Sequence, residues 1–182
     1  MKLLPLTQEI LTSTTDKWHS QLNFAGDDLT PVRYFRMLDS AEIHLQGDRD
    51  NYMIYALCDD GDPAAKAFIN ITHAHPGHNE SWLKILDIIA EPVLDYNYRE
   101  TNEITYISKT NGICKLTASI LTETLQLSDT KHKAKQIKLY GGSQIDKSML
   151  FIVIDTLKAL GFEKLGFEIS QHSNWLVLTK QI

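Results

Sequence analysis

The segment from Lys109 to Cys114 has the residue types of an anion-binding turn. It reads K-T-N-G-I-C, and an apolar helical pattern follows it. The first amides of a helix have no acceptor within the helix, and the helix dipole adds partial positive charge at that end. A glycine lets an anion approach the backbone closely, and a lysine adds a full charge. The pattern predicts a phosphate site at a helix N-terminus, formed by Lys109, Thr110, Asn111, Gly112, Ile113 and Cys114.

Three histidines, His73, His75 and His78, lie close together in the segment I-T-H-A-H-P-G-H. Imidazoles at this spacing after a strand can converge on one zinc ion, and the pattern resembles the H-x-H-x-D-H signature of metallo-β-lactamase-type hydrolases. Gly77 stands where that signature has aspartate, and the stretch before His73 is too short for the crossover helix of such a fold. A solvent-facing turn is the simpler interpretation, and a zinc hydrolase is the alternative.

Strand patterns precede the glycine turn. Tyr52–Leu57 and Ala65–Thr72 are rich in β-formers, and the Asp/Gly turn between them is typical of a hairpin. The segment Ser81–Asp95 holds a third long strand. Pro92 cannot donate to a ladder, so it must lie at a bulge, an edge or the strand end. A shorter extended segment, Glu103–Ile107, is expected to lead into the turn.

Helical patterns surround these strands. A short strand, Lys2–Leu6, is expected before a helix that Thr7 caps, and a second helix is expected to begin at Thr30 and Pro31. After the glycine turn, apolar residues recur at helical spacing as far as Leu125. That spacing predicts a long helix laid on a sheet.

The last part of the chain is typical of a strand, a helix and two strands. Gln136–Tyr140 is the first strand, and Ser143 is expected to cap a helix that Gly161 ends. Phe162–Ile169 and Trp175–Ile182 alternate in polarity, which predicts two closing strands.

Composition indicates a soluble globular protein. The chain has 182 residues, 43% apolar and 23% charged, which suits one domain. A net charge of −5 argues against a nucleic-acid partner. Cys58 and Cys114 indicate neither a disulfide framework nor a cysteine-rich metal site, and they fit a reducing compartment. Because no apolar run is long enough to span a bilayer, we expect a cytoplasmic protein without a membrane partner.

The expected order of elements resembles the Gcn5-related N-acetyltransferase (GNAT) superfamily over nearly the whole chain. The hairpin Tyr52–Thr72, the turn K-x-x-G-x-C and the ending L-K-A-L-G-F at Leu157–Phe162 carry the likeness. The turn is similar to the Gln/Arg-x-x-Gly-x-Gly/Ala turn that holds the pyrophosphate of acetyl-coenzyme A in that family. The resemblance implies a single α/β domain, residues 1–182, with a mixed central sheet flanked by helices on both faces.

By this resemblance, the protein is an N-acetyltransferase that transfers an acyl group from acetyl-CoA, or another acyl-CoA, to an amine without a metal. In such proteins the strand before the glycine turn splays from the next strand, and pantetheine pairs with its edge. Leu83–Leu94 resembles that strand, but about ten to fifteen surplus residues separate it from Lys109. Either Glu103–Ile107 takes its place, or an inserted loop intervenes.

Acyl transfer to an amine needs a base for the amine and a proton source for the departing thiolate. Asp87 and Glu91 stand among apolar residues, share one face of an undistorted strand, and could have raised pKa values through desolvation. Strand acids that simply face water are the alternative. The family often places a tyrosine on its last helix, where this chain has Leu157. Tyr140 is the nearest substitute for that acid, or a partly buried core aromatic.

The acceptor is expected to be a small-molecule or peptide amine, and an acidic chain would suit a cationic one. Lys109 in place of Gln or Arg, Cys114 in place of Gly or Ala, and the missing helix tyrosine favour a second interpretation. In it, the protein is a non-catalytic relative that binds CoA or serves as an interaction module. Close packing is the favoured explanation for Cys114. A homodimer through edge strands is compatible with this fold.

Overall fold

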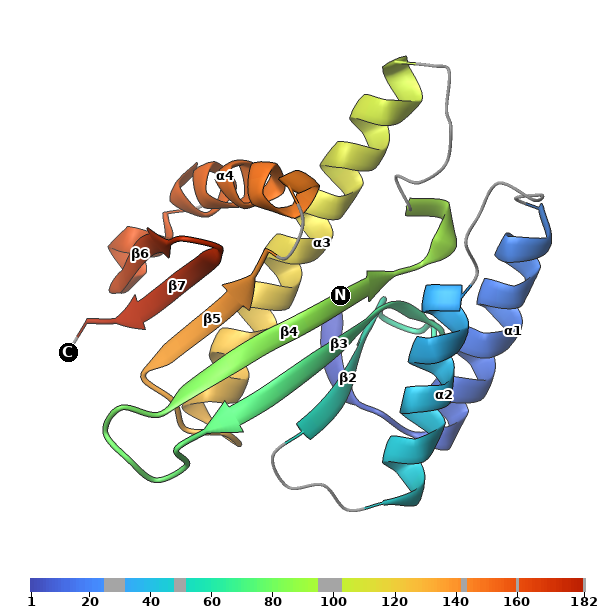
Figure 1. Ribbon diagram of the computed structural model, residues 1–182, viewed down its shortest axis with the longest axis horizontal. Coiled ribbons are helices and arrows are strands. Elements are labelled where there is room, and N and C mark those ends of the chain that lie inside the picture. Colours follow the sequence, from blue (N-terminus) through green and yellow to red (C-terminus); the bar gives the residue numbers. More distant parts are fainter. Residues whose placement is uncertain (25–31, 48–51, 95–102, 142–143, 160, 182) are drawn as a thin grey trace. The chain divides into compact units, whose positions relative to one another are not determined.

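The helices and strands follow the order expected from the resemblance (Figure 1). The computed structural model describes residues 1–24, 32–47, 52–94, 103–141, 144–159 and 161–181. The elements are β1 (Lys2–Pro5), α1 (Gln8–Phe24), α2 (Val32–Gln46), β2 (Tyr52–Cys58), β3 (Ala65–Ala74), β4 (Trp82–Ala90), α3 (Glu103–Asp129), β5 (Gln136–Tyr140), α4 (Gln144–Ala159), β6 (Phe167–His172) and β7 (Trp175–Lys180). Short 3-10 helices occupy Pro92–Leu94 and Phe162–Leu165.

The strands form a seven-stranded mixed sheet in the order β1-β2-β3-β4-β5-β7-β6. β1 and β2 are antiparallel, β4 and β5 are parallel, and β7 lies antiparallel between β5 and β6. The α/β class with a mixed sheet is therefore confirmed. The hairpin β2–β3 and the strand Gln136–Tyr140 also lie where the sequence predicts them.

Contacts divide the chain into two compact units. The first unit consists of Met1–Asn70 with Ile88–Ile113, and the second consists of Ile71–Asp87 with Cys114–Ile182. β3, β4 and α3 contribute residues to both units, so each unit combines distant parts of the sequence.

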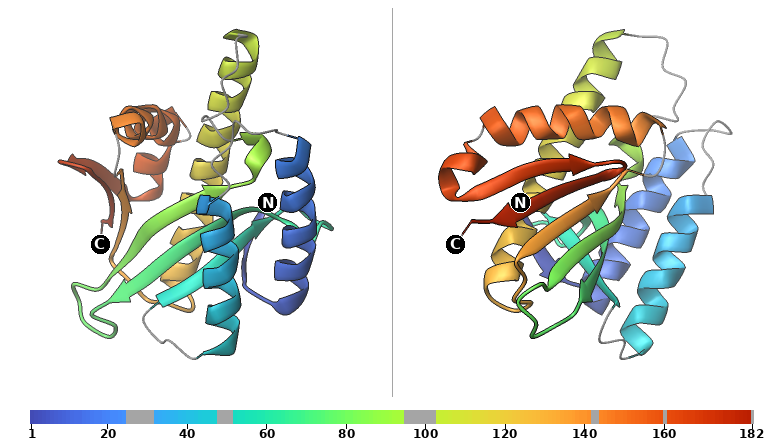
Figure 2. Two further views of the ribbon diagram at one scale, coloured as in Figure 1. Left: turned by 45° about the vertical axis from the view of Figure 1, so that its right-hand side comes forward. Right: turned by 60° about the vertical axis from the view of Figure 1, so that its left-hand side comes forward.

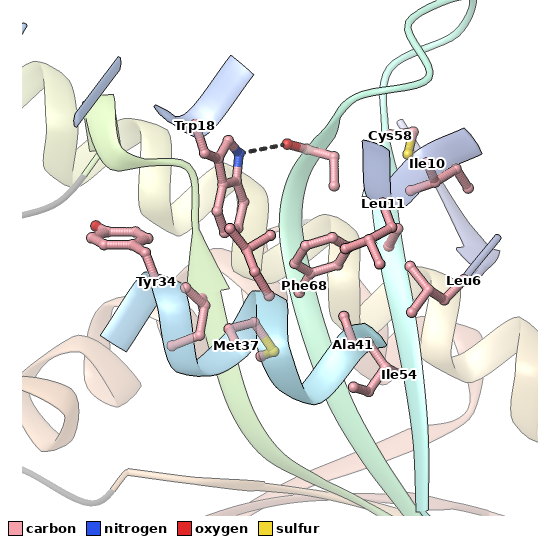
Figure 3. Close-up of a cluster of buried hydrophobic side chains, with 14 residues drawn as sticks. Leu6, Ile10, Leu11, Trp18, Tyr34, Met37, Ala41, Ile54, Cys58 and Phe68 are labelled. Carbon is pink, nitrogen blue, oxygen red and sulfur yellow. Dashed lines mark hydrogen bonds between the residues drawn. The ribbon is translucent and has the colours of Figure 1, made fainter. Parts of the chain in front are cut away.

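In the first unit, α1 and α2 pack on β2 and β3 through a buried apolar cluster (Figure 3). Thr7 caps α1 as expected, because the amide of Ile10 donates to Thr7 Oγ1 at 3.2 Å. Trp18 is fully buried in the cluster, and its indole N–H donates to the carbonyl oxygen of Ala65 at 3.1 Å. The expected start of the second helix at Thr30 and Pro31 lies outside the described residues.

In the second unit, the strands bury alternate residues. Leu83 and Ile85 on β4 and Leu139 on β5 are buried, whereas the residues between them are at least partly exposed. α4 runs beside β6 and β7 (Figure 2). The buried positions of the helices are Leu116, Ile120, Leu121 and Leu125 on α3, and Leu150, Val153 and Leu157 on α4. The predicted cap at Ser143 lies outside the described residues.

The strand expected over Phe162–Ile169 begins later than predicted. Gly161 and Gly166 both adopt left-handed conformations, with φ of 79° and 84°, and they bracket the 3-10 helix Phe162–Leu165. Two left-handed residues break an extended chain, so β6 starts only at Phe167.

The extended segment predicted over Glu103–Ile107 is wrong, because these residues form the first turns of α3. β-branched residues favoured a strand, but such preferences are weak where no neighbouring strand pairs with the backbone. Extending a helix adds one hydrogen bond for each residue that it orders. β4 is therefore the strand that precedes this helix. β4 ends at Ala90, so Pro92 follows the strand end, which is one of the three positions predicted for it. The linker 95–102 lies outside the described residues.

Candidate functional site

Lys109 to Cys114 lie inside α3 rather than at its N-terminus. The helix begins at Glu103, so more than one turn precedes Thr110. At such positions each backbone amide bonds to the carbonyl four residues earlier, and only the first four amides of a helix are open to an anion. The predicted turn is therefore wrong. Its amides, from Thr110 to Cys114, do not form an anion site in this conformation.

Packing accounts for the two residues that made this segment look like a turn. A Cβ atom on Gly112 would lie 3.2 Å from Cδ2 of Leu94, so a small residue suits this contact. Cys114 is 6% exposed, and burial raises the pKa of its thiol. Close packing, the favoured explanation for Cys114, agrees with this burial.

The change Gly112→Ala tests whether this position belongs to a helix interior. We expect the free energy of unfolding to rise by up to about 1 kcal/mol, because alanine orders a helix at lower entropic cost than glycine. The tip of the half-buried Leu94 side chain would have to shift by a few tenths of an ångström. Chemical denaturation measures the change. A ligand-binding turn would instead show loss of acetyl-CoA binding with little gain in stability.

Glu91, a predicted catalytic base, is 4% exposed and both of its carboxylate oxygens are engaged. Lys66 Nζ donates to Oε1 at 2.9 Å, and Gln21 Nε2 donates to Oε2 at 3.1 Å. Lys17 Nζ lies 3.9 Å from Oε2. The hydrogen bond to Glu91 raises the pKa of Lys66 despite the opposing effect of burial. This arrangement resembles a structural ion-pair network more closely than a base awaiting an amine.

The same network extends to the turn between β2 and β3. Lys17 Nζ donates to Asp62 Oδ2 at 2.9 Å, and Asp62 Oδ1 accepts from the amide of Ala64 at 2.9 Å. These hydrogen bonds, with that from Lys17 first, lower the pKa of Asp62. Burial, helped by Asp62 and Asp59, raises the pKa of the Cys58 thiol to about 11, so this thiol remains protonated. Glu91 and Asp62 thus tie α1 to the hairpin.

Asp87, the other predicted base, is an exposed residue of β4. The expectation that it shares one strand face with Glu91 is wrong, because β4 ends at Ala90. Asp87 lies beyond the last residue of β4 that pairs with β5. The parallel register begins at Trp82 and Gln136 and ends at Ile85 and Leu139.

In the described part of these strands, β4 and β5 share no registered pair after Ile85 and Leu139, and we call the stretch beyond that pair the opening between β4 and β5. β4 continues to Ala90, whereas β5 ends at Tyr140. The exposed fraction of Leu86 is 40%, high for an apolar residue inside a strand. In the described part of the two strands, the register stops one residue before Leu86. That β4 splays from β5 beyond this point, as the resemblance implies, stays a prediction.

Tyr140, the predicted proton donor, stands at the end of β5 beside this opening. It is 43% exposed, and its ring centroid lies 4.8 Å from that of Trp175. This exposure differs from that of a core aromatic. Tyr140 and Asp87 thus both come from the strand positions that follow the last β4–β5 pair, whereas Glu91 has a different environment.

His75 and His78 lie close together, with ring centroids 6.2 Å apart, whereas His73 has other neighbours. His73 lies beside His132, with ring centroids 5.7 Å apart, and its Nε2 is 3.2 Å from the carbonyl oxygen of Lys133. His75 instead meets Trp82 edge-on at 4.8 Å. Within the described ranges, no group of three His, Cys, Asp or Glu side chains could hold a metal ion. These contacts favour the turn interpretation over a zinc hydrolase.

One feature of the second unit was missed in the sequence: four side chains that we call the lysine–tryptophan face, namely Trp82, Lys84, Lys138 and Trp175. Lys138 Nζ lies 4.0 Å from the centroid of the Trp82 ring. Lys84 Nζ lies 5.7 Å from the Trp82 centroid and 5.6 Å from the Trp175 centroid. The alternation W-x-K and K-x-Y on successive strands was a visible signal, but only the register brings these residues together.

None of the helices in the described part of the chain is both long enough and apolar enough to cross a membrane.

The chain matches no protein-family model and no curated protein sequence. Among solved structures, it is similar to an acetyltransferase from Thermus thermophilus, at 11% identity and a TM-score of 0.42, over 100% of this chain and 98% of the other. It is also similar to a putative acetyltransferase from Sphaerobacter thermophilus, at 12% identity and a TM-score of 0.43, over 99% and 92% of the two chains. At these values the likenesses carry no argument about activity, which must come from the residues of this chain.

Proposed function

We propose that the protein binds an acyl-coenzyme A and transfers its acyl group to an amine. The observation that carries the proposal is that the parallel register of β4 and β5 ends at Ile85 and Leu139, although β4 continues to Ala90. A strand edge without a neighbour offers backbone donors and acceptors to an extended ligand, and the amide groups of pantetheine can pair with them. The order of elements, which resembles the GNAT superfamily, supports this use of the opening.

Two side chains beside the opening suit the chemistry. The amine must lose a proton as its nitrogen forms a bond to the thioester carbon, and the thiolate must gain one as the C–S bond breaks. We assign the first proton to Asp87, which alternation puts on the same face of β4 as Ile85, and the second to the Tyr140 phenol, which lies on the opposite face. We do not assign Glu91 to the base role, because Lys66 and Gln21 already engage its carboxylate oxygens.

A second candidate function is CoA binding without turnover. The observation that favours it is that Lys66 and Gln21 engage the carboxylate oxygens of Glu91, a predicted base. The helical conformation of Lys109–Cys114 within α3 also removes the amide cradle expected for a pyrophosphate. Such a protein would retain the opening between β4 and β5 but would bind the nucleotide end of CoA weakly. Measurements of binding and of turnover separate the two functions.

Thermal unfolding with acetyl-CoA tests the proposal. At 100 times its dissociation constant, a ligand adds about 2.7 kcal/mol to the native state, which corresponds to a rise in Tm of roughly 5–10 °C for a chain of this size. We expect this rise with acetyl-CoA and a smaller one with adenosine 3′,5′-bisphosphate, which lacks pantetheine. Equal shifts with both ligands, or no shift with either, would contradict binding at the strand opening.

The variants Tyr140→Phe and Asp87→Asn then distinguish an enzyme from a binding protein. Each should lower the release of free thiol from acetyl-CoA by about 10²-fold or more, because proton transfer contributes on this scale. The rise in Tm with acetyl-CoA should persist in both variants. Acetyl-CoA binding without thiol release in the unmodified protein, across a set of amines, would favour the non-catalytic function.

A further inference from the structure

The lysine–tryptophan face carries hydrogen-bond donors that have no acceptor in the described part of the chain. Lys84 lies opposite Lys138 in the β4–β5 register, and residues in register share a face of the sheet. Within the described part of the chain, neither ammonium group forms an ion pair. The indole N–H of Trp82 is also buried without a hydrogen-bond acceptor there. The two ammonium groups thus lie together where an anion would supply the missing acceptors.

Among the described strand residues of the second unit, the register places one acidic side chain on this face of the sheet. By register, Glu168 on β6 shares the face, in the row that runs through Thr179 and Gln136 to Trp82. It stands three strands away from Lys84 and two strands away from Lys138, roughly 14 Å and 10 Å across the sheet, and about 7 Å along it from both. Both combined separations exceed the Debye length of about 8–10 Å at physiological salt, so Glu168 neutralises neither lysine effectively.

The tryptophan rings hold the lysines in place before any ligand arrives. An ammonium group over an indole face is attracted to it, and this contact limits the freedom of a long side chain. Burial lowers the pKa of Lys138, and the neighbouring charge of Lys84 lowers it further. Bound negative charge would relieve that repulsion, so the face is arranged for an anion and not for a cation.

The face also adjoins the opening between β4 and β5. Lys84 and Lys138 form the row directly before the last pair, and Leu86 and Tyr140 are the next residues on the same face. Successive residues on one strand face are about 7 Å apart. A molecule with an amine at the opening and an oxyanion a few bonds away could therefore reach the ammonium groups.

We propose that the lysine–tryptophan face binds the anionic group of the acyl acceptor, which is therefore a small amine bearing a carboxylate or a phosphate. This assignment rests on the proposed acyl transfer. It replaces the sequence-based expectation of a cationic acceptor, which followed from net charge alone. The lysine–tryptophan face carries two positive charges although the whole chain carries −5.

Tryptophan fluorescence without any CoA tests the anion site. The probes are matched amines, phosphoethanolamine against ethanolamine and glycine against glycinamide. Trp82 and Trp175 lie in the face and should report binding, whereas Trp18 is fully buried elsewhere. We expect phosphoethanolamine to bind at least about tenfold more tightly than ethanolamine, or glycine at least about tenfold more tightly than glycinamide. Added salt should weaken the binding of the anionic amine. Equal affinities within both pairs, or no signal with any probe, would overturn the proposal.

Variants identify the residues responsible. The double variant Lys84→Met/Lys138→Met keeps the aliphatic stems and should lose the preference for anions. Lys138→Arg keeps the charge and should retain that preference. Lys158→Gln removes an exposed positive charge on α4 and should leave the preference unchanged. Circular dichroism checks that each variant is folded. A preference that survives the double variant, or one that Lys158→Gln also abolishes, would contradict the assignment.

Further measurements distinguish an acyl acceptor from other ligands of the lysine–tryptophan face. With acetyl-CoA present, the anionic amines should release free thiol faster than their counterparts. Anion binding without any acetyl-CoA shift would retain the anion site but overturn its assignment to an acyl acceptor. An oligothymidylate that binds through Lys84 and Lys138 more tightly than any small amine would overturn it in favour of single-stranded nucleic acid.

Discussion

Replacing Trp18 by alanine is expected to lower the free energy of unfolding by about 3–5 kcal/mol, the usual loss when a buried tryptophan is truncated. Trp18 is 0% exposed, and its ring contacts Tyr34 at 5.8 Å and Phe68 at 5.2 Å between centroids. It therefore joins α1 to both α2 and β3. Truncation would leave a cavity in the apolar cluster of the first unit, and the surrounding side chains can fill it only in part.

The hydrogen bonds around Ala65 explain why a smaller aromatic ring would not fully replace this residue. Trp18 donates to the carbonyl oxygen of Ala65, and Thr14 Oγ1 accepts from the Ala65 amide at 2.8 Å. Both backbone groups of this buried residue thus depend on α1. Trp18→Phe keeps most of the apolar volume but removes the indole donor, so we expect a loss of about 1–3 kcal/mol.

Guanidinium denaturation followed by far-ultraviolet circular dichroism measures both losses without relying on tryptophan emission. Thr12→Ala is a suitable control, because Thr12 is an exposed residue on the same helix. It should change stability by less than about 0.5 kcal/mol. A loss below about 1 kcal/mol for Trp18→Ala would contradict the central position of Trp18 in this cluster.

Glu91→Gln is expected to lower the free energy of unfolding by about 2–3 kcal/mol. Removing one partner of a buried pair leaves the other charge uncompensated, and the usual cost is about 3–5 kcal/mol. The lower value is expected because the side chains of Lys66 and Lys17 remain 26% and 29% exposed. Asp59→Asn is the matched control. Its carboxylate is 3.9 Å from Lys66 and 48% exposed, so its loss should cost less than about 1 kcal/mol.

The difference in the free energy of unfolding between the parent protein and Glu91→Gln should depend on pH, and the direction of that dependence follows from the pKa of Lys66. The pKa of Lys66 is raised in the folded protein, mainly by its hydrogen bond to Glu91. Stabilisation by Lys66 is therefore complete below the unfolded pKa of about 10.4 and is lost as pH rises through the higher folded value. Denaturation curves for the parent protein and Glu91→Gln should differ from neutral pH to about pH 10 and should converge above it.

A double-mutant cycle decides between the structural and catalytic roles of Glu91. Lys66→Gln combined with Glu91→Gln should cost less than the sum of the single changes, because both partners of the pair are then absent. If Glu91→Gln instead abolished thiol release and changed stability by less than about 0.5 kcal/mol, Glu91 would be the base of the sequence-based prediction. The ion-pair interpretation would then be wrong.

The sequence alone determined the order of the elements and most of their ends. Runs of β-forming residues on either side of an Asp/Gly turn located β2 and β3, because both signals are local in the sequence. Thr7 marked the start of a helix because its side chain accepts a hydrogen bond from a helix amide. Gly161 marked the end of a helix because it adopts a left-handed backbone conformation. The resemblance in element order predicted the mixed sheet, in which β4 and β5 form a parallel pair.

Local patterns failed where distant contacts decide between two conformations. Glu103–Ile107 has strand-forming residues, yet it extends α3, and this places Lys109–Cys114 within a helix. The same limit applies to the carboxylates. Asp87 and Glu91 look alike in sequence, but Asp87 is exposed on β4, whereas Glu91 is buried against Lys66 and Gln21.

The lysine–tryptophan face shows why only the tertiary structure could reveal it. Trp82 and Lys84 come from β4, Lys138 from β5 and Trp175 from β7, so these residues are far apart in the sequence. Strand order and register decide which side chains become neighbours, and a shift of one residue would move each to the opposite face. The sequence determined which residue types were present and how they alternated along each strand. Pairing between strands decided that two lysines and two tryptophans would meet.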